Sequence, residues 1–449
     1  MSRFLFATIA VTAHTSNPLP IAARLVERGH EVRWYAGRGF HDRIAATGAR
    51  PLPYEAAVDF SVGDLWEHFP QLKDASGVAV ISRAFADVFI GQAAARVADL
   101  QGILADEPAD AVLSDGLMYG VGMVHELGGP PWATFGDGPL PFEEPGVPPF
   151  GPGLAPMGGP IGRLRDGVVR AVARRALFRR PQQVYDRTRA ALGLPPDPRP
   201  AIEAAASPYL HLQGCTPGFE YPRRALPAHA HWVGAFRPDP PAGWDPPAWW
   251  GDVVAGDRPV VHVSQGSLRP DVTELVLPSL RGLADLDALV VVTTGGASAD
   301  EVARAYAEAY GGPLPGNARV APFVPYDTLL ALASVFVTNG GYSGVTMALH
   351  HGVPLVQAGT TEEKSEIAAR IAWAGVGVKL GTTRPSAEQV GAGVRTILAE
   401  PSPYRAAAER VGAEMRTHDA ARESADLLER LAATGRPVTR AEAPASRVG

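Results

Sequence analysis

The chain has 449 residues, which favours two domains, and its formal net charge of −6 argues against nucleic acid as a partner of the whole surface. Its single cysteine, Cys215, excludes an internal disulfide and indicates a reducing, cytoplasmic location. No apolar run reaches the roughly 18 residues that a membrane span requires. We expect the apolar N-terminus to be a first strand rather than a signal peptide, because it runs into a polar turn without a cleavage site.

The first half of the chain alternates between strand and helix patterns. Asn17 is expected to cap the first helix, with Pro18 as its first residue. The expected elements, in chain order, are a strand over 3–13, a turn over 14–17, a helix that stops at Gly29, a strand from Glu31, a helix over 83–105 and a strand from Ala111 that ends at Asp115. This order predicts a parallel α/β sheet.

The middle of the chain is rich in Pro and Gly, and residues 136–160 are expected to be loop. Residues 161–190 are expected to be helical and carry seven arginines from Arg163 to Arg180. Such a helix could lie on an anionic membrane, although a solvated face is the commoner explanation. We divide the chain into a first domain over 1–232, a linker over 233–248 and a second domain over 249–433, followed by a tail over 434–449 that we expect to be disordered.

The second half repeats the strand and helix rhythm. Strands are expected at 260–264, 288–293 and 335–338, and an amphipathic helix is expected over 403–432. The two halves therefore predict an α/β protein with two parallel sheets.

A Gly-rich turn after Thr338 is the most informative motif. The apolar strand stops at Asn339-Gly340-Gly341, and helical character resumes after Ser343-Gly344. Such a turn points backbone N–H groups at a ligand, and the helix N-terminus adds partial positive charge, so the motif predicts a phosphate or diphosphate site. A tight turn without a ligand is the alternative.

The residues around this turn resemble a known family. Phe323-Val324-Pro325 precedes it, and Thr360-Thr361-Glu362-Glu363-Lys364 follows it. This order resembles the donor-binding segment of family 1 glycosyltransferases with the GT-B fold, which has two Rossmann-like domains whose parallel sheets face a central cleft. It is most similar to the actinobacterial enzymes that glycosylate antibiotics, macrolides among them, and other natural products. In that fold the last helix crosses back to the first domain, which we expect here.

The resemblance implies a role for each motif. Phe323, with Val324, would bind the nucleobase, and Glu363 and Lys364 would bind the sugar. The diphosphate would be held by Asn339, Gly340, Gly341, Ser343 and Gly344, and by Ser267 in an earlier loop. The chain departs from the family where Asn339 replaces a histidine, Met347 replaces the glutamate that often holds the ribose, and Lys364 replaces a glutamine.

The first half contributes His14 and Asp115, which both follow expected strands. Ligands gather at the carboxyl ends of parallel strands. A neutral imidazole can take a proton from a hydroxyl, and a carboxylate can orient the ring. A histidine in a turn is more often structural, but the resemblance implies that His14 is the catalytic base and that Asp115 is its partner.

Aromatic residues of the first half are candidates for binding an acceptor. Trp66, Phe69, Phe135 and Phe142 fall in apparent loops, where they could contact a flat or apolar molecule or could pack in the core. No Gly-x-Gly-x-x-Gly follows the first strand, which argues against a nicotinamide dinucleotide.

These observations predict an inverting glycosyltransferase. It would move a hexose from a dTDP- or UDP-sugar to a hydroxyl of an apolar natural product, as a monomer or homodimer, without a cofactor or required metal. A sugar-nucleotide epimerase on the same fold is the alternative, as is a silent partner of another transferase. The aromatic loops favour a second substrate over an epimerase, and the presence of both His14 and Asp115 speaks against a silent partner.

Overall fold

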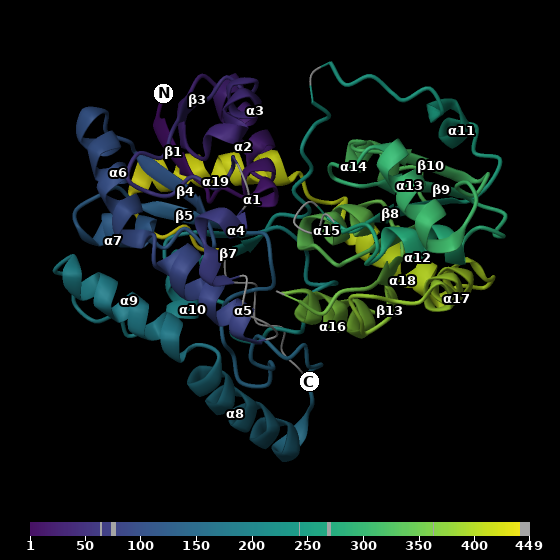
Figure 1. Ribbon diagram of the computed structural model, residues 1–449. Coiled ribbons are helices and arrows are strands. Elements are labelled where there is room, and N and C mark those ends of the chain that lie inside the picture. Colours follow the sequence, from purple (N-terminus) through teal and green to yellow (C-terminus); the bar gives the residue numbers. More distant parts are fainter. Residues whose placement is uncertain (63–64, 73–77, 242, 267–270, 362, 441–449) are drawn as a thin grey trace.

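The computed structural model describes residues 1–62, 65–72, 78–241, 243–266, 271–361 and 363–440, and it divides into two α/β units (Figure 1). Each unit is built on one parallel sheet. The first sheet has the order β3 (Arg50–Leu52), β2 (Glu31–Tyr35), β1 (Arg3–Ala7), β4 (Ala111–Asp115), β5 (Trp132–Gly136), β6 (His211–Gln213) and β7 (Ala230–Trp232). The second has the order β10 (Ala318–Ala321), β9 (Leu289–Thr293), β8 (Val260–Ser264), β11 (Val335–Thr338), β12 (Leu355–Gln357) and β13 (Gly377–Lys379).

Helices cover both faces of each sheet, which explains why the central strands β4 and β8 are buried along their whole length and are mostly apolar. The helical segments of the first unit are α1 (Thr12–Ser16), α2 (Leu19–Glu27), η1 (Arg38–Phe40), α3 (His41–Ala45), α4 (Leu65–His68), η2 (Pro70–Leu72), α5 (Val78–Arg83), η3 (Ala84–Ile90), α6 (Ala93–Asp106), α7 (Gly120–Glu126), α8 (Gly159–Ala176), α9 (Arg179–Ala191) and α10 (Ala201–Ala204). Those of the second unit are α11 (Trp250–Val254), α12 (Val276–Gly282), α13 (Ala299–Tyr310), α14 (Tyr326–Leu330), α15 (Tyr342–His350), α16 (Lys364–Ala374), α17 (Ala387–Leu398) and α18 (Pro403–Met415), and the last helix of the chain is α19 (Ala420–Thr434).

Three expected helices are broken in the structure. The helix expected over 83–105 begins in α5, continues as the π-helical turn η3 and ends as α6. The helix expected over 161–190 is α8 followed by α9, and the helix expected over 403–432 is α18 followed by α19. In the last case Asp419 caps α19 by accepting from the Arg422 N–H, so a new helix begins there.

Helix α19 packs on the first unit, although it follows the second in sequence (Figure 1). Leu428 and Leu431 share a core with Phe4 and Ile21. At the edge of this contact Arg28 lies 2.7 Å from Asp426 and 3.0 Å from Glu429. The C-terminal helix therefore ties the two units together.

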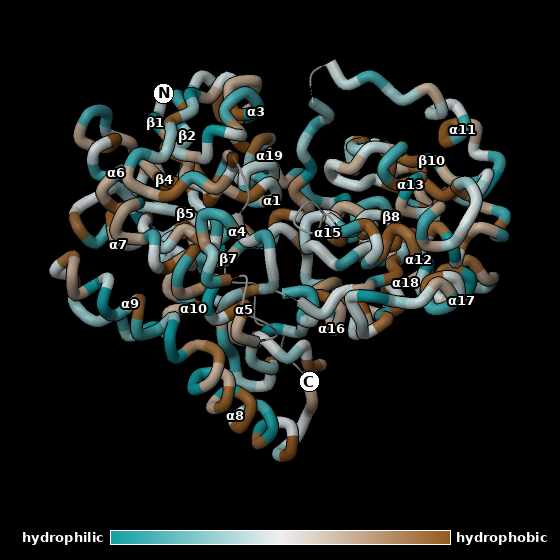
Figure 2. Tube along the Cα trace, viewed as in Figure 1, coloured by the Kyte–Doolittle hydropathy of each residue, from teal (hydrophilic) through white to brown (hydrophobic). Residues whose placement is uncertain are grey.

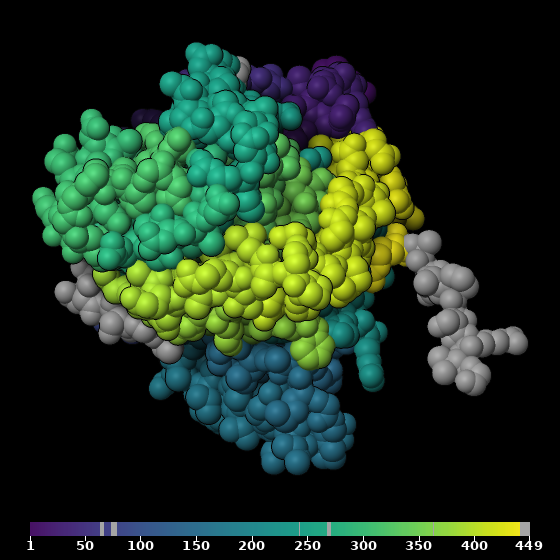
Figure 3. Space-filling model, turned by 90° about the vertical axis from the view of Figure 1, so that its right-hand side faces the viewer, coloured from purple at the N-terminus to yellow at the C-terminus, as the bar shows by residue number. Residues whose placement is uncertain are grey.

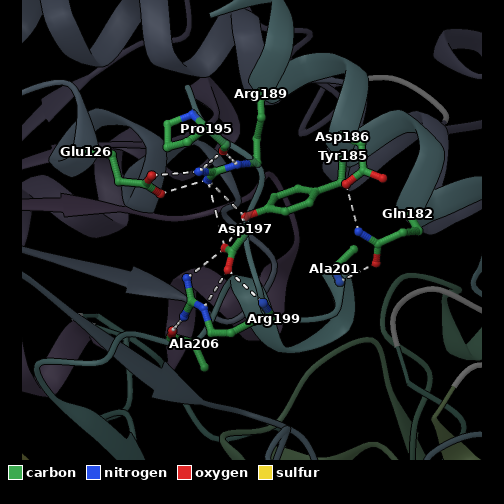
Figure 4. A network of polar contacts seen from close by, with 10 residues as sticks. All are labelled: Glu126, Gln182, Tyr185, Asp186, Arg189, Pro195, Asp197, Arg199, Ala201 and Ala206. Carbon is green, nitrogen blue, oxygen red and sulfur yellow. Dashed lines mark hydrogen bonds and ion pairs between the residues drawn. The ribbon is translucent and has the colours of Figure 1, made fainter. Parts of the chain in front are cut away.

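Helix α9 is fixed to the first unit by a partly buried polar network (Figure 4). Both terminal nitrogens of Arg189 donate to Glu126 of α7 at 2.7 Å, and Tyr185 donates to Asp197 at 2.8 Å. This bidentate arrangement holds a planar guanidinium in one orientation. The network therefore anchors α9, from whose N-terminal end α8 extends away from the body of the molecule (Figure 1).

Among the described helices none is both long and apolar enough to cross a membrane.

Candidate active site

His14 lies within the short helix α1 rather than in the turn that the sequence predicts, because the chain coils directly after β1. Asn17 ends α1 instead of capping the next helix, and Pro18 precedes α2 as its N-cap. The His14 side chain is 15% exposed, and its Nδ1 atom lies 2.8 Å from Asp137 Oδ2 and 3.4 Å from Asp115 Oδ1. Two carboxylates therefore meet the same ring nitrogen.

Asp115 ends β4 and is fully buried. Its Oδ2 accepts the Ile9 N–H at 2.7 Å, and its Oδ1 accepts the Leu117 N–H at 2.7 Å. These bonds fix the backbone after β1 to the end of β4. The structure thus brings Asp115 beside His14, as the sequence predicts, but gives it a backbone-organising role as well.

Asp137 is a site residue that the sequence interpretation missed. It directly follows β5, the neighbour of β4, and its side chain is 9% exposed. The signal that could have found it is the apolar run from Trp132 to Phe135, which ends in Gly136-Asp137 just as the previous strand ends in an aspartate. Since β4 and β5 are adjacent and parallel, their carboxyl ends place both aspartates at one edge of the sheet.

The two aspartates govern the charge of His14. Burial disfavours the imidazolium form, but the Asp137 carboxylate and the nearby Asp115 outweigh it, so the pKa of His14 is raised well above the usual value. Both carboxylates lie at Nδ1, so the Nδ1 proton stays there when the ring is neutral. Nε2 then carries the lone pair, which makes it the basic atom.

The Gly-rich turn connects β11 to α15, as the sequence predicts. Gly340 has φ +94, and a Cβ there would lie 2.8 Å from Gln357 Nε2, so a side chain is excluded by both conformation and space. The Gly340 N–H donates to Thr338 Oγ1 at 3.1 Å, and the Asn339 side-chain amide donates to the Gln265 carbonyl. The N–H groups at the start of α15, from Gly341 to Gly344, are the ones that helix geometry leaves for a ligand.

Among the described residues, two side-chain hydrogen bonds join this turn and the start of α15 to the first unit. The Asn17 side-chain amide donates to Ser343 Oγ at 2.9 Å, and the Gln213 amide donates to Tyr342 Oη at 2.8 Å. Asn17 lies only three residues after His14 in the chain. The candidate base and the candidate diphosphate turn therefore lie side by side across the boundary between the units.

The candidate sugar-binding residues lie beside the same turn. Lys364 is buried and lines a small pocket with Asn339, Gln265 and Thr361. A Cβ on Gly359 would lie 3.0 Å from Lys364 Cδ, so the lysine stem passes close over this glycine. Glu363 is the N-cap residue of α16. Ser267, the remaining candidate diphosphate residue, lies outside the described residues.

The candidate nucleobase residues differ in exposure. Phe323, between β10 and α14, is 49% exposed, whereas the Val324 side chain is fully buried in the core of the second unit. Of these two side chains, only the Phe323 ring can stack on a nucleobase without a rearrangement of the core. Met347, at the family's ribose position, is also buried in a core cluster.

The candidate acceptor aromatics are corrected in part. Phe135 lies in strand β5, not in a loop, and is fully buried against Phe236. Phe69 is buried against Phe60, so core packing accounts for both rings. Phe142 is half-buried and meets His211 edge-on at 5.2 Å between ring centroids. The side chain of Trp66 lies outside the described residues.

Comparison with known proteins shows which class of proteins has this fold. Residues 278–431 match the family of the erythromycin biosynthesis protein CIII-like C-terminal domain. The crystal structure of CalG4, the calicheamicin glycosyltransferase, matches 97% of this chain and 99% of its own with a TM-score of 0.71 at 20% identity. That of VinC in complex with dTDP matches 96% and 99% with a TM-score of 0.68 at 22% identity. The fold is GT-B.

Relatives with higher identity define the family. The chain is 40% identical over 431 residues to 4'-demethylrebeccamycin synthase of Lentzea aerocolonigenes, covering 96% of this chain and 99% of that protein. It is 31% identical over 442 residues to UDP-glycosyltransferase 2 of Phaeomoniella chlamydospora, covering 96% and 95%. The chain therefore belongs to the GT-B glycosyltransferases of the antibiotic and natural-product type. It is a sugar-nucleotide-dependent glycosyltransferase, and the relatives named as glycosyltransferases favour the transferase interpretation over the epimerase and silent-partner alternatives.

Proposed function

We propose that this enzyme transfers a hexose from a dTDP- or UDP-sugar to a hydroxyl of an apolar natural product, with inversion at the anomeric carbon. The observation that carries the proposal is the position of His14. Its Nδ1 is held by Asp137 and Asp115, while Asn17 joins the same segment to the diphosphate turn at Ser343. A base this close to the leaving-group site suits a single displacement, in which the acceptor oxygen replaces the diphosphate at the anomeric carbon.

In the proposed reaction His14 Nε2 accepts the proton of the acceptor hydroxyl. The acceptor oxygen forms a bond to the anomeric carbon on the face opposite the diphosphate, and the bond from that carbon to the diphosphate oxygen breaks. The imidazolium that forms is stabilised by the Asp137 carboxylate 2.8 Å from Nδ1. One displacement of this kind inverts the configuration.

The departing diphosphate is proposed to bind at the start of α15. Backbone N–H groups from Gly341 to Gly344 and the helix dipole favour its negative charge. Lys364 lines the adjacent pocket and supplies a cationic side chain where the family has a neutral glutamine. Ser267 and the Asn339 amide are proposed as further donors to the diphosphate, and Glu363 as an acceptor for sugar hydroxyls.

We propose uracil or thymine as the nucleobase of the donor, because the proteins that this chain resembles include both. One relative is named a UDP-glycosyltransferase, and one structural neighbour is a complex with dTDP. The acceptor is proposed to be a natural product, as the name of 4'-demethylrebeccamycin synthase indicates for that relative. We propose Phe142 as an acceptor contact, since it remains half-buried.

The test is transfer by a His14→Ala variant with UDP- and dTDP-sugars and a panel of phenolic and polyketide acceptors. Removal of a general base should lower kcat by about 10²–10⁴-fold. The dissociation constant of the nucleoside diphosphate should change by less than about twofold, because the donor binds the second unit. His41→Ala is the matched control, since that half-buried histidine lies elsewhere in the first unit and contacts the Ala36 carbonyl. Near wild-type transfer by folded His14→Ala would overturn the assignment of the base, and an anomeric configuration retained in the product would overturn inversion.

A further inference from the structure

Helix α8 presents its apolar side chains to solvent rather than to the protein. Ile161, Leu164, Val168 and Val172 are between 56% and 76% exposed. Their spacing of three and four residues places all four on one face of the helix. The buried positions of the same helix are Gly162 and Asp166. An amphipathic helix that served only to cover its own domain would have the opposite orientation.

This apolar stripe is unusual in the described part of the chain, where other large exposed apolar side chains occur singly along the sequence. Figure 2 shows strongly hydrophobic and strongly hydrophilic residues alternating along α8. Figure 3 shows the segment projecting below the second unit, at the bottom of the view. The anchored helix α9 holds its C-terminal end in place (Figure 4). The stripe is therefore held at a protruding end of the molecule.

Arginines outnumber acidic side chains around the stripe, although Arg180 also has an acidic neighbour, Asp87, at 2.7 Å. Residues 159–180 contain seven arginines and one acidic residue, Asp166, whereas the whole chain has a net charge of −6. Arg165 borders the stripe and lies 2.7 Å from Asp166, while Arg170 and Arg174 pair with Glu143 at 2.9 and 2.8 Å. Arg163, Arg175 and Arg179 are exposed. The segment is thus a local cationic patch on an anionic protein.

We propose that α8 docks on an anionic membrane surface, with its apolar stripe in the interfacial region of the bilayer and its arginines at the lipid phosphates. Apolar side chains on one face and arginines beside it are the combination that binds such a surface. The long arginine side chains can bury their stems while their charged ends stay at the headgroups.

A second copy of the chain fits the stripe less well. Stable protein interfaces bury about 800 Å² on each partner, more than four side chains of one helix provide. Pairing two α8 helices would also place arginines of both copies next to one another, which repels. Charge complementarity therefore favours anionic lipid as the occupant.

The experiment is co-sedimentation of the full chain with vesicles of phosphatidylglycerol and phosphatidylcholine, and with vesicles of phosphatidylcholine alone. We expect binding to the anionic vesicles at least tenfold stronger than to the neutral ones, and weaker at 0.5 M than at about 0.05 M salt. Replacing Ile161, Leu164, Val168 and Val172 by Ser should lower the partition coefficient at least tenfold. Arg163→Glu with Arg175→Glu and Arg179→Glu should do the same.

Matched controls separate this site from general surface properties. Val254→Ser with Leu332→Ser removes exposed apolar side chains of the second unit, and Arg304→Glu with Arg410→Glu and Arg430→Glu makes the same change of net charge on other helices. Both controls should bind like the wild type, and all variants should retain their circular dichroism and thermal transition. Absence of wild-type binding to anionic vesicles would overturn the proposal, as would undiminished binding by the serine or glutamate variants of α8. A dimer dispersed by the serine variant, without vesicle binding, would assign the stripe to a second copy instead.

Discussion

Asn17 and Ser343 are 326 residues apart in the chain, yet the Asn17 side-chain amide donates a hydrogen bond of 2.9 Å to the Ser343 hydroxyl. Asn17 is buried and ends the short helix that carries His14. Ser343 lies in the first turn of α15, where the diphosphate is proposed to bind. The contact therefore connects the proposed base to the proposed leaving-group site.

This contact predicts coupling between the two residues. Asn17→Ala and Ser343→Ala should each lower kcat/KM about 5- to 30-fold, corresponding to the roughly 1–2 kcal/mol of a hydrogen bond between partly buried groups. Because each change breaks the same bond, the double variant should lose less than the product of the single losses. Steady-state kinetics of the three variants measures this, and strictly multiplicative losses would show that the two residues act separately.

Phe323 offers a second prediction, about the nucleobase. An aromatic ring that stacks on a base contributes roughly 1–3 kcal/mol in single-strand binding proteins, so Phe323→Ala should raise the dissociation constant of UDP or dTDP about tenfold or more. The variant should fold normally, since the ring is half exposed. Tyr310→Ala is the control, because Tyr310 is a comparably exposed aromatic residue of the same unit, in α13. Calorimetry that finds equal affinities for wild type and Phe323→Ala would remove Phe323 from the site.

The sequence was sufficient for those parts of the site that depend on local patterns. The turn at Gly340 is a strand, a Gly-rich break and a helix in immediate succession, Asp115 is the last residue of β4, and His14 follows β1 in the short helix α1. Asp137 was missed because its place beside His14 depends on β5 being the neighbour of β4, which is a property of the sheet order. Phe135 was assigned to a loop because the Pro and Gly residues that follow it obscured a strand of five residues.

Contacts between distant segments were also beyond local patterns. Nothing near Asn17 indicates that it meets Ser343, and nothing near Gln213 indicates that it meets Tyr342. The break between α18 and α19 depends on Asp419 competing as a cap within a segment whose apolar periodicity continues on both sides. Local periodicity therefore predicts the presence of helices better than their ends.

A third prediction concerns metal. The proposed diphosphate site uses backbone N–H groups, the dipole of α15 and the nearby Lys364, which together supply positive charge without a metal ion. Transfer should therefore retain most of its rate in excess EDTA. Lys364→Met should lower kcat about tenfold or more by removing the one side-chain cation assigned to the leaving group. Assays with and without chelator test this, and loss of wild-type transfer in EDTA that Mg²⁺ or Mn²⁺ restores would contradict the mechanism.

Asp115 should contribute more to folding than its neighbour Asp137. Both Asp115 oxygens accept backbone N–H groups from buried segments, at 2.7 Å each. Asp115→Ala leaves the Ile9 and Leu117 N–H groups without these acceptors and should lower the free energy of unfolding by about 2–6 kcal/mol, at roughly 1–3 kcal/mol for each group. Urea unfolding of the two alanine variants, followed by circular dichroism, measures the difference. Equal loss of stability at Asp137 would show that its carboxylate has the same structural role.

Asp137 should instead set the pH at which His14 works. Burial lowers the pKa of His14, but the Asp137 carboxylate, 2.8 Å from Nδ1, and Asp115 raise it well above its usual value. The base acts when neutral, so kcat should rise with pH through this raised pKa. Asp137→Asn removes the nearest negative charge, so the acidic limb of the kcat profile should move to lower pH, while kcat on the plateau falls about tenfold or more because the imidazolium formed in the reaction loses its counter-ion.

The same raised pKa also makes the stability of the protein depend on pH. A folded-state pKa of His14 above the unfolded value of about 6.5 stabilises the protein below about pH 6.5, and this stabilisation is lost as the pH rises through the folded-state pKa. Asp137→Asn should therefore destabilise the protein more at pH 6 than above the folded-state pKa of His14. His14→Gln should abolish both the acidic limb of the kcat profile and this pH-dependent difference in stability. If the acidic limb of Asp137→Asn is not shifted, Asp115 rather than Asp137 is the carboxylate that positions His14.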